Sequence, residues 1–560
     1  MNRSSDINRS SGERTVQVRS PLLWVLLPLM GGYAAGLWLP SVPVSFLVGA
    51  ALLAGSGAVW FSQSSCGRVI GWHVFFCVAV FSGSWAWWLE RVPAVPAEWE
   101  VLPAREVEVQ MVVTRVFRAS DDGRYWRGVG TLISADPLVA ELVGQSVVYS
   151  VRGTEEGMVP VAGARLYLRG VISRLDNDDP FDRLWESQQV FFRLRQGQLL
   201  ASPDRGPSWR QWAAAERSRW AEILSRSGPE QQRLAGVLGA MMLGDRALLD
   251  PLLQEQFLLS GTMHLFAVSG LHVMAVGGAL FGLASLLPLP RSVRTWVALI
   301  FLGVYVGVIG LPPSAIRAYA MLVFYCVGRG LTRRTAPFPA VVASAVVLLI
   351  WDPRQLLGLG FQLSYTVVAA ILLLGLPLGN TVESWFRSRS VMRVEMPGIW
   401  NQRLADLRRY VVQVCAISLA ASAASAPLVV RHFEVFTPGA VLLNPLLVPV
   451  AGLVVVDGVI VLLLGLLGLE GLSQFFAQGA WVLIAGMELV VQGALWLPGM
   501  FGHRGWVQAA SGLWLTLAFL WLSLCMHFRT MIPRWPPLVR FALPIVVVLV
   551  VLMWGTQRLS

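Results

Sequence analysis

The chain has 560 residues, of which 55% are hydrophobic and only 14% are charged, and its mean hydropathy is +0.60. A soluble protein of this length needs far more charge to cover its surface, so the composition excludes that class and indicates a membrane protein. The formal net charge is +11, and every one of the 44 basic residues is arginine. Arginine suits phosphate groups, although its exclusive use also follows from genome base composition.

The predicted elements begin with an arginine-rich tail over 1–20 and three transmembrane helices within 21–90, near 21–39, 43–61 and 69–89. Each apolar segment approaches the ~20 residues that cross a bilayer as a helix. The tail arginines and Arg68 mark the cytoplasmic side by the positive-inside rule, so we expect a cytoplasmic N-terminus and an outer position for residue 90. The tail has no small-residue cleavage site and does not look like a signal peptide.

Residues 100–205 change character, with short alternating apolar runs separated by glycines and polar turn residues. The runs lie near 106–109, 126–133, 146–151, 165–171 and 190–199. This pattern predicts an inserted extracytoplasmic β-domain of five strands, a small barrel that we expect to be OB-like. An interfacial amphipathic helix is predicted next, over 208–230, because arginines there alternate with tryptophans.

A long membrane domain follows over 234–530, and a last transmembrane helix and tail over 531–560. The spans are placed near 264–288, 295–311, 314–328, 337–351, 357–378, 411–430, 440–468, 475–497, 508–527 and 541–555. The predicted fold is therefore a polytopic all-α membrane protein with about 13 spans. Arginine clusters in the connections all fall on the cytoplasmic side of this topology.

Polar groups concentrate where the membrane helices are predicted to break. The segment 257–273 holds His264, Ser269 and His272, and Gly261 and Gly270 interrupt it. The two histidines are ~12 Å apart along a helix, which is too far to share a metal ion, and no third ligand is evident. Ser269 and His272 lie one turn apart, either as a structural hydrogen-bonded pair or as the nucleophile and base of an intramembrane hydrolase, although no Gly-x-Ser-x-Gly elbow surrounds the serine.

A second break is predicted at 310–317, where two prolines end one helix, Ser314 can cap the next, and Arg317 lies one turn inside it. An arginine at a helix N-terminus suits an anion. The alternative is that Arg317 extends to the lipid headgroups or pairs with a buried acid such as Asp457 or Glu488.

Two further segments add polar candidates. Gln362 and Tyr365 lie at the start of a helix, and Asn444 and Asp457 lie in the 440–468 run, which two prolines are expected to interrupt. The predicted substrate path consists of His264, Ser269, His272, Arg317, Gln362, Tyr365, Asn444 and Asp457.

Five ordered blocks together resemble the ComEC family of competence proteins, which are DNA-internalisation channels. They are Phe257 to Val273, Pro313 to Met321, Gly360 to Ser364, Pro427 to Phe433 and Asn444 to Pro449. The resemblance implies a channel that imports single-stranded DNA across the bacterial cytoplasmic (inner) membrane during natural transformation. It implies a DNA receptor and pilus system outside, an ATPase or strand-binding protein inside, and no cofactor.

Many family members continue into a metallo-β-lactamase-like domain, which we do not expect here because the sequence stops at Ser560 and contains no His-x-His-x-Asp-His motif. We therefore expect a short form that is not an enzyme, with a separate nuclease as a further potential partner. The sequence has no GxxxxGK[ST] loop, so the energy for transport is expected from another protein. The alternative on the same scaffold is a transporter or flippase for another anionic substrate; the intramembrane hydrolase is the weaker alternative.

Under the lead interpretation, the external domain presents one candidate surface for DNA. The domain has 13 arginines and 15 acidic residues between Glu100 and Arg205, so any surface that binds phosphates must be a local patch. The candidates are Arg115, Arg118, Arg124, Tyr125, Trp126 and Arg127, whose rings could stack on bases. The alternative is a solvated strand edge.

Overall fold

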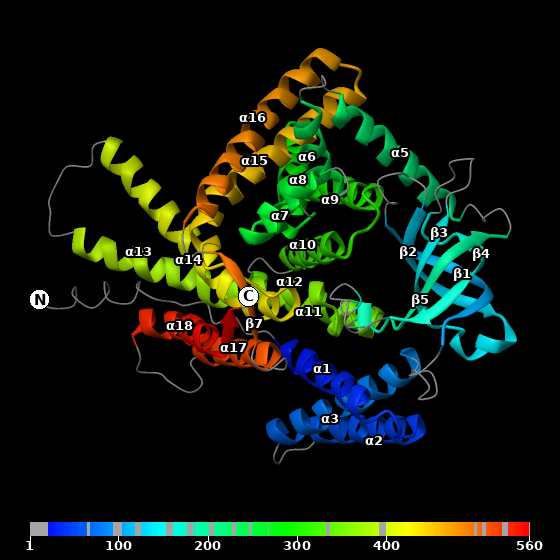
Figure 1. The fold of residues 1–560 in the computed structure, drawn as a ribbon. Coiled ribbons are helices and arrows are strands. Elements are labelled where there is room, and N and C mark those ends of the chain that lie inside the picture. The colour runs from blue at the N-terminus through cyan, green and yellow to red at the C-terminus, as the bar shows by residue number, and fades with distance from the viewer. Residues whose placement is uncertain are drawn as a thin grey trace, which may run out of the picture.

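The computed structural model places a small β-barrel beside a large assembly of helices (Figure 1). The structure describes residues 21–63, 68–92, 103–117, 125–152, 161–175, 182, 185–186, 188–200, 206–226, 231–245, 249–266, 268–331, 336–390, 399–497, 501–506, 511–528 and 536–558.

Three apolar helices open the chain, as predicted: α1 (Leu23–Trp38), α2 (Val44–Gln63) and α3 (Arg68–Arg91). Small residues let α1 approach α3 closely. A Cβ atom at Gly32 would lie 2.3 Å from the carbonyl oxygen of Phe81, so only glycine allows this contact. The Tyr33 hydroxyl donates to the Leu349 carbonyl at 2.9 Å and thereby joins α1 to the membrane domain.

The five predicted strands are confirmed and form a closed barrel in the order β1-β2-β3-β5-β4. They are β1 (Arg105–Phe117), β2 (Tyr125–Ala135), β3 (Ser146–Arg152), β4 (Arg165–Arg174) and β5 (Phe192–Leu199). All neighbouring pairs are antiparallel except β3 and β5, which run parallel. A short 3-10 helix (Pro137–Leu142) connects β2 to β3.

Alternate residues of β1 fill the barrel interior, where Val107, Val109, Met111 and Val113 are buried. A register shift between Val113 and Arg115 then changes which residues face inward. As a result Phe117 packs outside the barrel against Trp185, with ring centroids 5.3 Å apart.

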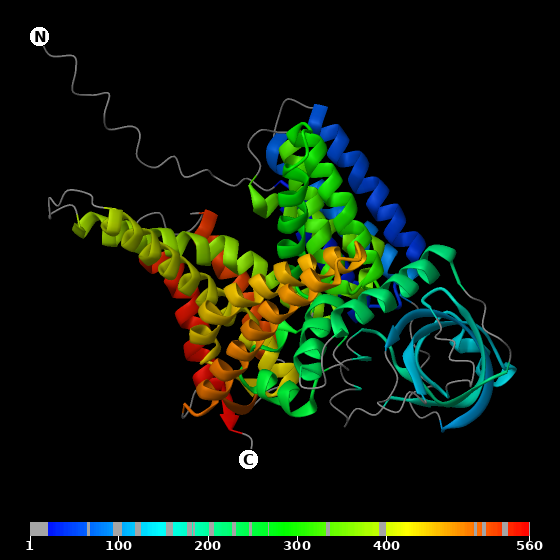
Figure 2. The ribbon, with the colours of Figure 1, turned by 90° about the horizontal axis from the view of Figure 1, so that it is seen from above.

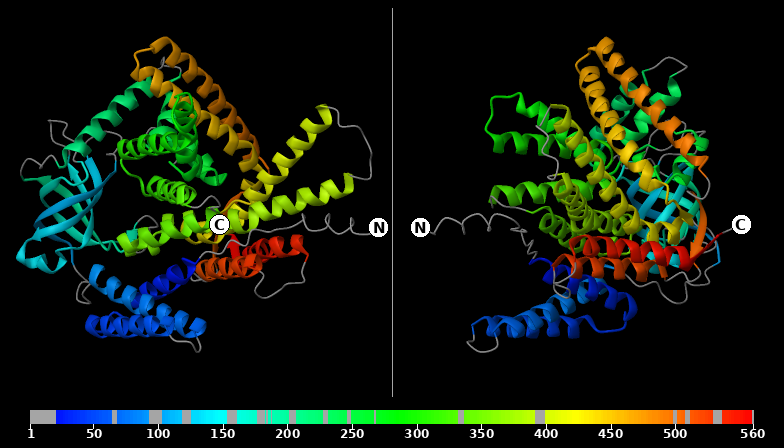
Figure 3. Two further views of the ribbon diagram at one scale, coloured as in Figure 1. Left: turned by 180° about the vertical axis from the view of Figure 1, so that it is seen from behind. Right: turned by 90° about the vertical axis from the view of Figure 1, so that its left-hand side faces the viewer.

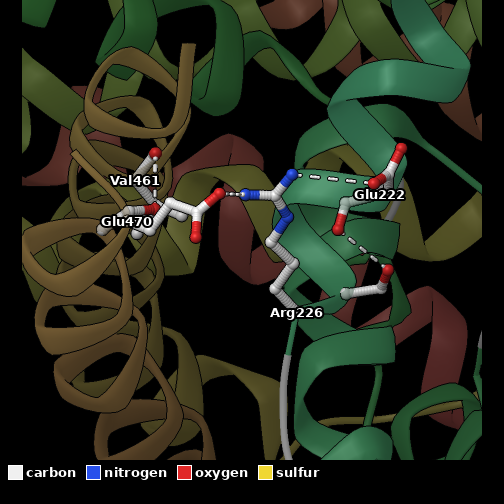
Figure 4. Close-up of polar contacts among 6 residues, drawn as sticks. Glu222, Arg226, Val461 and Glu470 are labelled. Carbon is white, nitrogen blue, oxygen red and sulfur yellow. Dashed lines mark hydrogen bonds and ion pairs between the residues drawn. The ribbon is translucent and has the colours of Figure 1, made fainter. Parts of the chain in front are cut away.

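The helix α5 (Ser208–Ser225) leads from the barrel to the far end of a helical hairpin. That hairpin consists of α15 (Ala440–Leu466) and α16 (Glu470–Leu495). Just past the end of α5, Arg226 lies between Glu222 and Glu470, with a 2.6 Å contact to the Glu470 carboxylate (Figure 4). Ile223 also packs on Gly465, where an added Cβ would lie 2.4 Å from its Cγ2 atom. The end of α5 is therefore fixed to the turn of the hairpin.

The remaining helices form the body of the membrane domain. They are α6 (Gln232–Leu243), α7 (Pro251–Leu259), α8 (Gly270–Ser285), α9 (Arg291–Val308), α10 (Pro313–Leu331), α11 (Pro337–Trp351), α12 (Leu359–Ala370), α13 (Leu376–Ser390), α14 (Ile399–Phe433), α17 (Ser511–Phe528) and α18 (Pro537–Gly555). A 3-10 turn (Pro353–Leu356) precedes α12, and a π-helical turn (Ile371–Gly375) joins α12 to α13. Short strands β6 (Val435–Phe436), β7 (Gly502–Trp506) and β8 (Thr556–Arg558) pair near the C-terminus.

The α13–α14 pair and the barrel lie at opposite ends of the molecule when it is seen from above (Figure 2). The blue helices α2 and α3 and the green helices project to one side, away from the C-terminus (Figure 3, right). Within the described residues, eight helices are long and apolar enough to cross a membrane, and four shorter apolar helices accompany them. The chain is therefore a polytopic helical protein with one inserted barrel.

The predicted interruption near 257–273 is confirmed. The helix α7 ends at Leu259, Gly261 takes a left-handed conformation with φ +73°, a 3-10 turn spans Met263–Leu265, and α8 begins at Gly270. The interruption expected at Pro445 and Pro449 is wrong, because α15 continues through both prolines. A proline removes one backbone hydrogen bond, and neighbouring helices can compensate for that loss inside a membrane domain.

Candidate functional site

Ser269 and His272 form a hydrogen-bonded pair at the N-terminus of α8. The Ser269 Oγ atom lies 2.9 Å from His272 Nδ1, and the Ser269 backbone N–H donates to the same nitrogen at 3.3 Å. Because Nδ1 accepts, the hydrogen of the neutral imidazole is on Nε2. That Nε2 atom is buried and has no hydrogen-bond partner of normal geometry among the described residues, although the Leu265 carbonyl is close. The pair serves as a helix cap and leaves one donor unused.

His264 lies in the 3-10 turn before α8, and its side chain is exposed. Its Nδ1 atom is 3.2 Å from the Gly261 carbonyl. Gly261 in turn packs against the segment that leads into α15, where an added Cβ would lie 2.5 Å from Thr437 Oγ1 and 3.2 Å from the Cβ atom of Ala440. The segment between α7 and α8 is therefore anchored to α15.

The expectation that Ser314 caps α10 is wrong. Because α10 already begins at Pro313, Ser314 lies inside its first turn, and its hydroxyl donates to the Val268 carbonyl at 2.5 Å. Gly270 packs on Ala318 one turn further, with 3.8 Å between the added Cβ position and the Ala318 Cβ. The two predicted breaks, before α8 and before α10, are therefore in direct contact.

Arg317 follows in the same turn of α10 and is only 6% exposed. The alternative that it pairs with Glu488 is wrong, because Glu488 accepts two hydrogen bonds from Arg233 at 2.8 and 2.7 Å. Among the described residues no carboxylate lies within ion-pair distance of Arg317, and its buried Nε atom has no hydrogen-bond partner. The guanidinium rests on Gly360 of α12, where an added Cβ would lie 3.2 Å from Nη2.

Gln362 and Tyr365 lie in the first turns of α12, as predicted, but both make local hydrogen bonds. The Gln362 amide donates to the carbonyl of Leu356 at 3.0 Å. The Tyr365 hydroxyl is 3.0 Å from Ser344 Oγ on α11. These two side chains hold the 3-10 turn and α11 against α12, next to Arg317.

Asn444 lies one residue before the first proline of α15. Its Oδ1 atom is buried without a hydrogen-bond partner among the described residues. The helix α15 packs against α8, so the Asn444 turn belongs to the same group of helices as His272. Asp457, by contrast, lies further along α15 beside Gly479 of α16, where an added Cβ would be 3.8 Å from its Oδ2 atom.

The candidate DNA surface of the barrel is only partly described. Arg118 and Arg124 lie outside the described residues, as does the side chain of Tyr125. Arg115 lies over the Phe117 ring at 5.0 Å, and Phe117 is paired with Arg127 across the β1–β2 ladder. Trp126, adjacent to Arg127 on one strand, points to the other face. Arg115 also lies within electrostatic range of Arg317, so the barrel and the membrane domain bring two like charges together.

Two contributors to this site were not predicted from the sequence. Gly360 was part of a recognised block, but its contact with the Arg317 guanidinium depends on the packing of α10 on α12. The hydroxyl of Ser418 on α14 donates to the Val441 carbonyl at 3.1 Å. In the sequence, Ser418 belonged to a pattern of small residues that predicted only close helix packing. Pro445, four residues after Val441, is the sequence feature that leaves this carbonyl without a helical partner.

Comparison with known proteins identifies the family that this helical domain resembles. A family described as "Competence protein" matches residues 241–531, just over half of the chain. ComE operon protein 3 of Bacillus subtilis is 29% identical over 233 residues, which cover 41% of this chain and 27% of that protein. Recombination protein 2 of Haemophilus influenzae is 31% identical over 148 residues, or 25% of this chain and 19% of that protein. The matches thus span about a quarter of each curated relative or less, and no solved structure matches.

Proposed function

Since this chain belongs to the ComEC family of competence proteins, we propose that it is a membrane channel that carries single-stranded DNA into the cytoplasm during natural transformation. The family match covers α8, α10, α12 and α15, which are the helices that carry the candidate path. On this proposal the matched domain provides the passage, and the barrel meets the strand first.

The observation that carries the proposal is a set of three unsatisfied polar atoms. His272 Nε2, Arg317 Nε and Asn444 Oδ1 are all buried and have no hydrogen-bond partner among the described residues. A buried polar group without a partner is costly, and in a membrane protein such groups mark a substrate or ion pathway. Two donors in the first turns of α8 and α10, and one acceptor beside a proline within α15, suit a substrate that presents both phosphates and bases.

The proposed topology places the barrel on the outer face of the cytoplasmic membrane and the N-terminus in the cytoplasm. The positive-inside rule supports this orientation, because Arg291 and Arg294 lie in the first turn of α9 and Arg329 lies in the last turn of α10. The turn between α9 and α10 then faces outward, on the same side as the barrel. We take the barrel to be OB-like because its strand order is 1-2-3-5-4 with β3 parallel to β5.

The proposed channel is passive and is not an enzyme. Ser269 and His272 support this view, because both are used in capping α8. Transport energy is then supplied by an ATPase or strand-binding protein inside, and a DNA receptor and pilus system deliver the DNA outside. A separate nuclease would remove the strand that is not imported.

The test is uptake of labelled DNA by a competent host that carries variants of this chain. Arg317→Ala and Asn444→Ala are expected to abolish uptake while the protein remains inserted in the membrane. Arg219→Gln, which removes an arginine of α5 whose side chain is 58% exposed, is the matched control and is expected to leave uptake intact. Normal transformation in a clean deletion strain would contradict the proposal and favour another anionic substrate.

A further inference from the structure

The strongest unexplained feature of the membrane domain is the charge of Arg317. Its side chain is only 6% exposed, yet no carboxylate within ion-pair distance balances it among the described residues. Three acids of the membrane domain have other environments among the described residues: Glu488 pairs with Arg233, Glu383 pairs with Arg408, and Asp457 lies beside Gly479 of α16. A buried charge without a counter-charge is unfavourable, so the site favours an anion that binds from outside the chain.

The polar neighbours of Arg317 on α12 do not supply that partner. The Gln362 amide is bonded to the Leu356 carbonyl, and the Tyr365 hydroxyl to Ser344. Gly360 presents no side chain at all, and an added Cβ there would lie 3.6 Å from Nη1 and 3.2 Å from Nη2 of the guanidinium. The two terminal nitrogens thus lie against bare backbone, and no described hydrogen bond occupies them.

The beginning of α10 adds a second source of positive potential. Gly310, with φ +90°, and Leu311, with φ +54°, turn the chain into a helix of 19 residues that starts at Pro313. Ser314 directs its hydroxyl to Val268 and away from the first-turn amides of its own helix. These amides and the helix dipole favour an anion at this end. Arg115 of the barrel is a further positive charge within electrostatic range of Arg317.

We infer that the first turn of α10, with Arg317 resting on Gly360, is a binding site for a single phosphodiester group at the junction between barrel and membrane domain. A guanidinium offers two parallel donors that match two phosphate oxygens, which a point charge such as lysine does not. The inference rests on the proposed function, under which the phosphodiester belongs to the DNA strand. A lipid headgroup carries the same chemical group, and the experiment separates these two sources.

The test uses the full chain in nanodiscs made of phosphatidylcholine and a labelled oligothymidine, with binding followed by fluorescence anisotropy over a series of salt concentrations. Arg317→Gln is expected to weaken binding about tenfold and to lower the slope of log affinity against log salt by about one, as expected for one lost phosphate contact. Arg317→Lys keeps the charge and is expected to recover only part of the affinity. Arg219→Gln, which changes an exposed arginine near Glu216 of the same helix, is expected to bind like the wild type.

Gly360→Ala is a second variant that keeps the charge of Arg317. Its methyl group would press on the guanidinium, so binding is expected to weaken while chromatographic behaviour stays that of the wild type. This variant distinguishes loss of the site from loss of the fold.

The lipid arm uses native mass spectrometry of the chain extracted from membranes that contain phosphatidylglycerol. Retention of this lipid by the wild type and its loss in Arg317→Gln, with unchanged oligothymidine binding, supports the site and assigns it to a headgroup. If Arg317→Gln changes neither oligothymidine binding nor lipid retention, the inference is overturned. If that variant keeps both its oligothymidine affinity and its bound lipid but still abolishes transformation, the site is wrong while the proposed channel stands; normal transformation in a deletion strain removes the channel itself.

Discussion

Ser418 of α14 donates its hydroxyl to the Val441 carbonyl of α15 at 3.1 Å, and Val441 is the residue four positions before Pro445. A proline has no N–H to donate to the carbonyl four residues earlier, so this oxygen loses its helical partner. The serine of a neighbouring helix replaces that partner. This relationship explains why α15 continues through a proline.

Ser418→Ala is expected to lower the free energy of unfolding by about 1–2 kcal/mol, because the Val441 carbonyl is left unsatisfied. In a Pro445→Ala background the same change is expected to cost much less, because the introduced alanine can supply the missing N–H. Thermal unfolding of the purified chain in detergent measures the cost of Ser418→Ala in the wild-type and in the Pro445→Ala background. The control is Ser425→Ala, because the Ser425 hydroxyl donates to the Ser422 carbonyl on its own helix. Equal costs in both backgrounds would contradict the compensation.

Arg233→Gln is expected to destabilise the membrane domain by about 2 kcal/mol, because it leaves the Glu488 carboxylate buried without its partner. The value is set below that of a fully buried pair because the Arg233 side chain is 49% exposed. The double variant Arg233→Gln/Glu488→Gln is expected to recover most of the loss. Thermal unfolding again measures the effect, and a double variant worse than Arg233→Gln alone would argue against it.

Tyr149→Phe is expected to stabilise the barrel by about 1 kcal/mol, because the Tyr149 hydroxyl is buried and has no hydrogen-bond partner among the described residues. Burial also raises the pKa of Tyr149, so the folded state keeps the phenolic proton at a pH where the unfolded chain loses it. The wild type therefore loses stability as the pH rises above ~10, and the phenylalanine variant does not lose this contribution.

Chemical denaturation of the barrel segment 100–205 at pH 7 and pH 10.5 measures this difference, since the barrel has its own closed core. The advantage of Tyr149→Phe is expected to grow at the higher pH. A constant difference at both values would show that the hydroxyl ionises equally in the folded and unfolded states.

Gly261→Ala is expected to destabilise the chain by about 1–3 kcal/mol, because the residue has φ +73° and its new Cβ would lie 2.5 Å from Thr437 Oγ1. The same change should reduce DNA uptake, because it moves the turn that carries His264. Gly278→Ala in α8, where no atom lies within 4 Å of the added Cβ, is the matched control. It is expected to be neutral or slightly stabilising through helix propensity.

Patterns of local periodicity predicted the architecture well. Alternation located all five strands, and glycines located the break between α7 and α8. The side-chain contacts could not be predicted in the same way, because they depend on which helices become neighbours. Ser314 bonds to Val268 rather than capping its own helix, and Glu488 pairs with Arg233 of α6, which lies 255 positions earlier.

The barrel shows the same limit at the scale of one strand. A perfect alternation along β1 would place Arg115 on the inner face with Val113. The register shift between these two residues turns Arg115 and Phe117 outward, and no sequence period reports such an irregularity. Similarly, the prolines of α15 correctly indicated a freed carbonyl but not that Ser418 would satisfy it.

The helix α5 is one continuous helix of 18 residues that connects the barrel to Arg226, which forms an ion pair with Glu470. Gly163 of the barrel packs on Pro207 at one end of this helix, and Gly465 of α15 packs on Ile223 at the other. A helix bends far less readily than a loop. A rotation of the barrel would therefore move the Glu470 end of the hairpin as well, because α5 joins the two. A tilt of the barrel would thereby be transmitted through α5 to the α15–α16 hairpin.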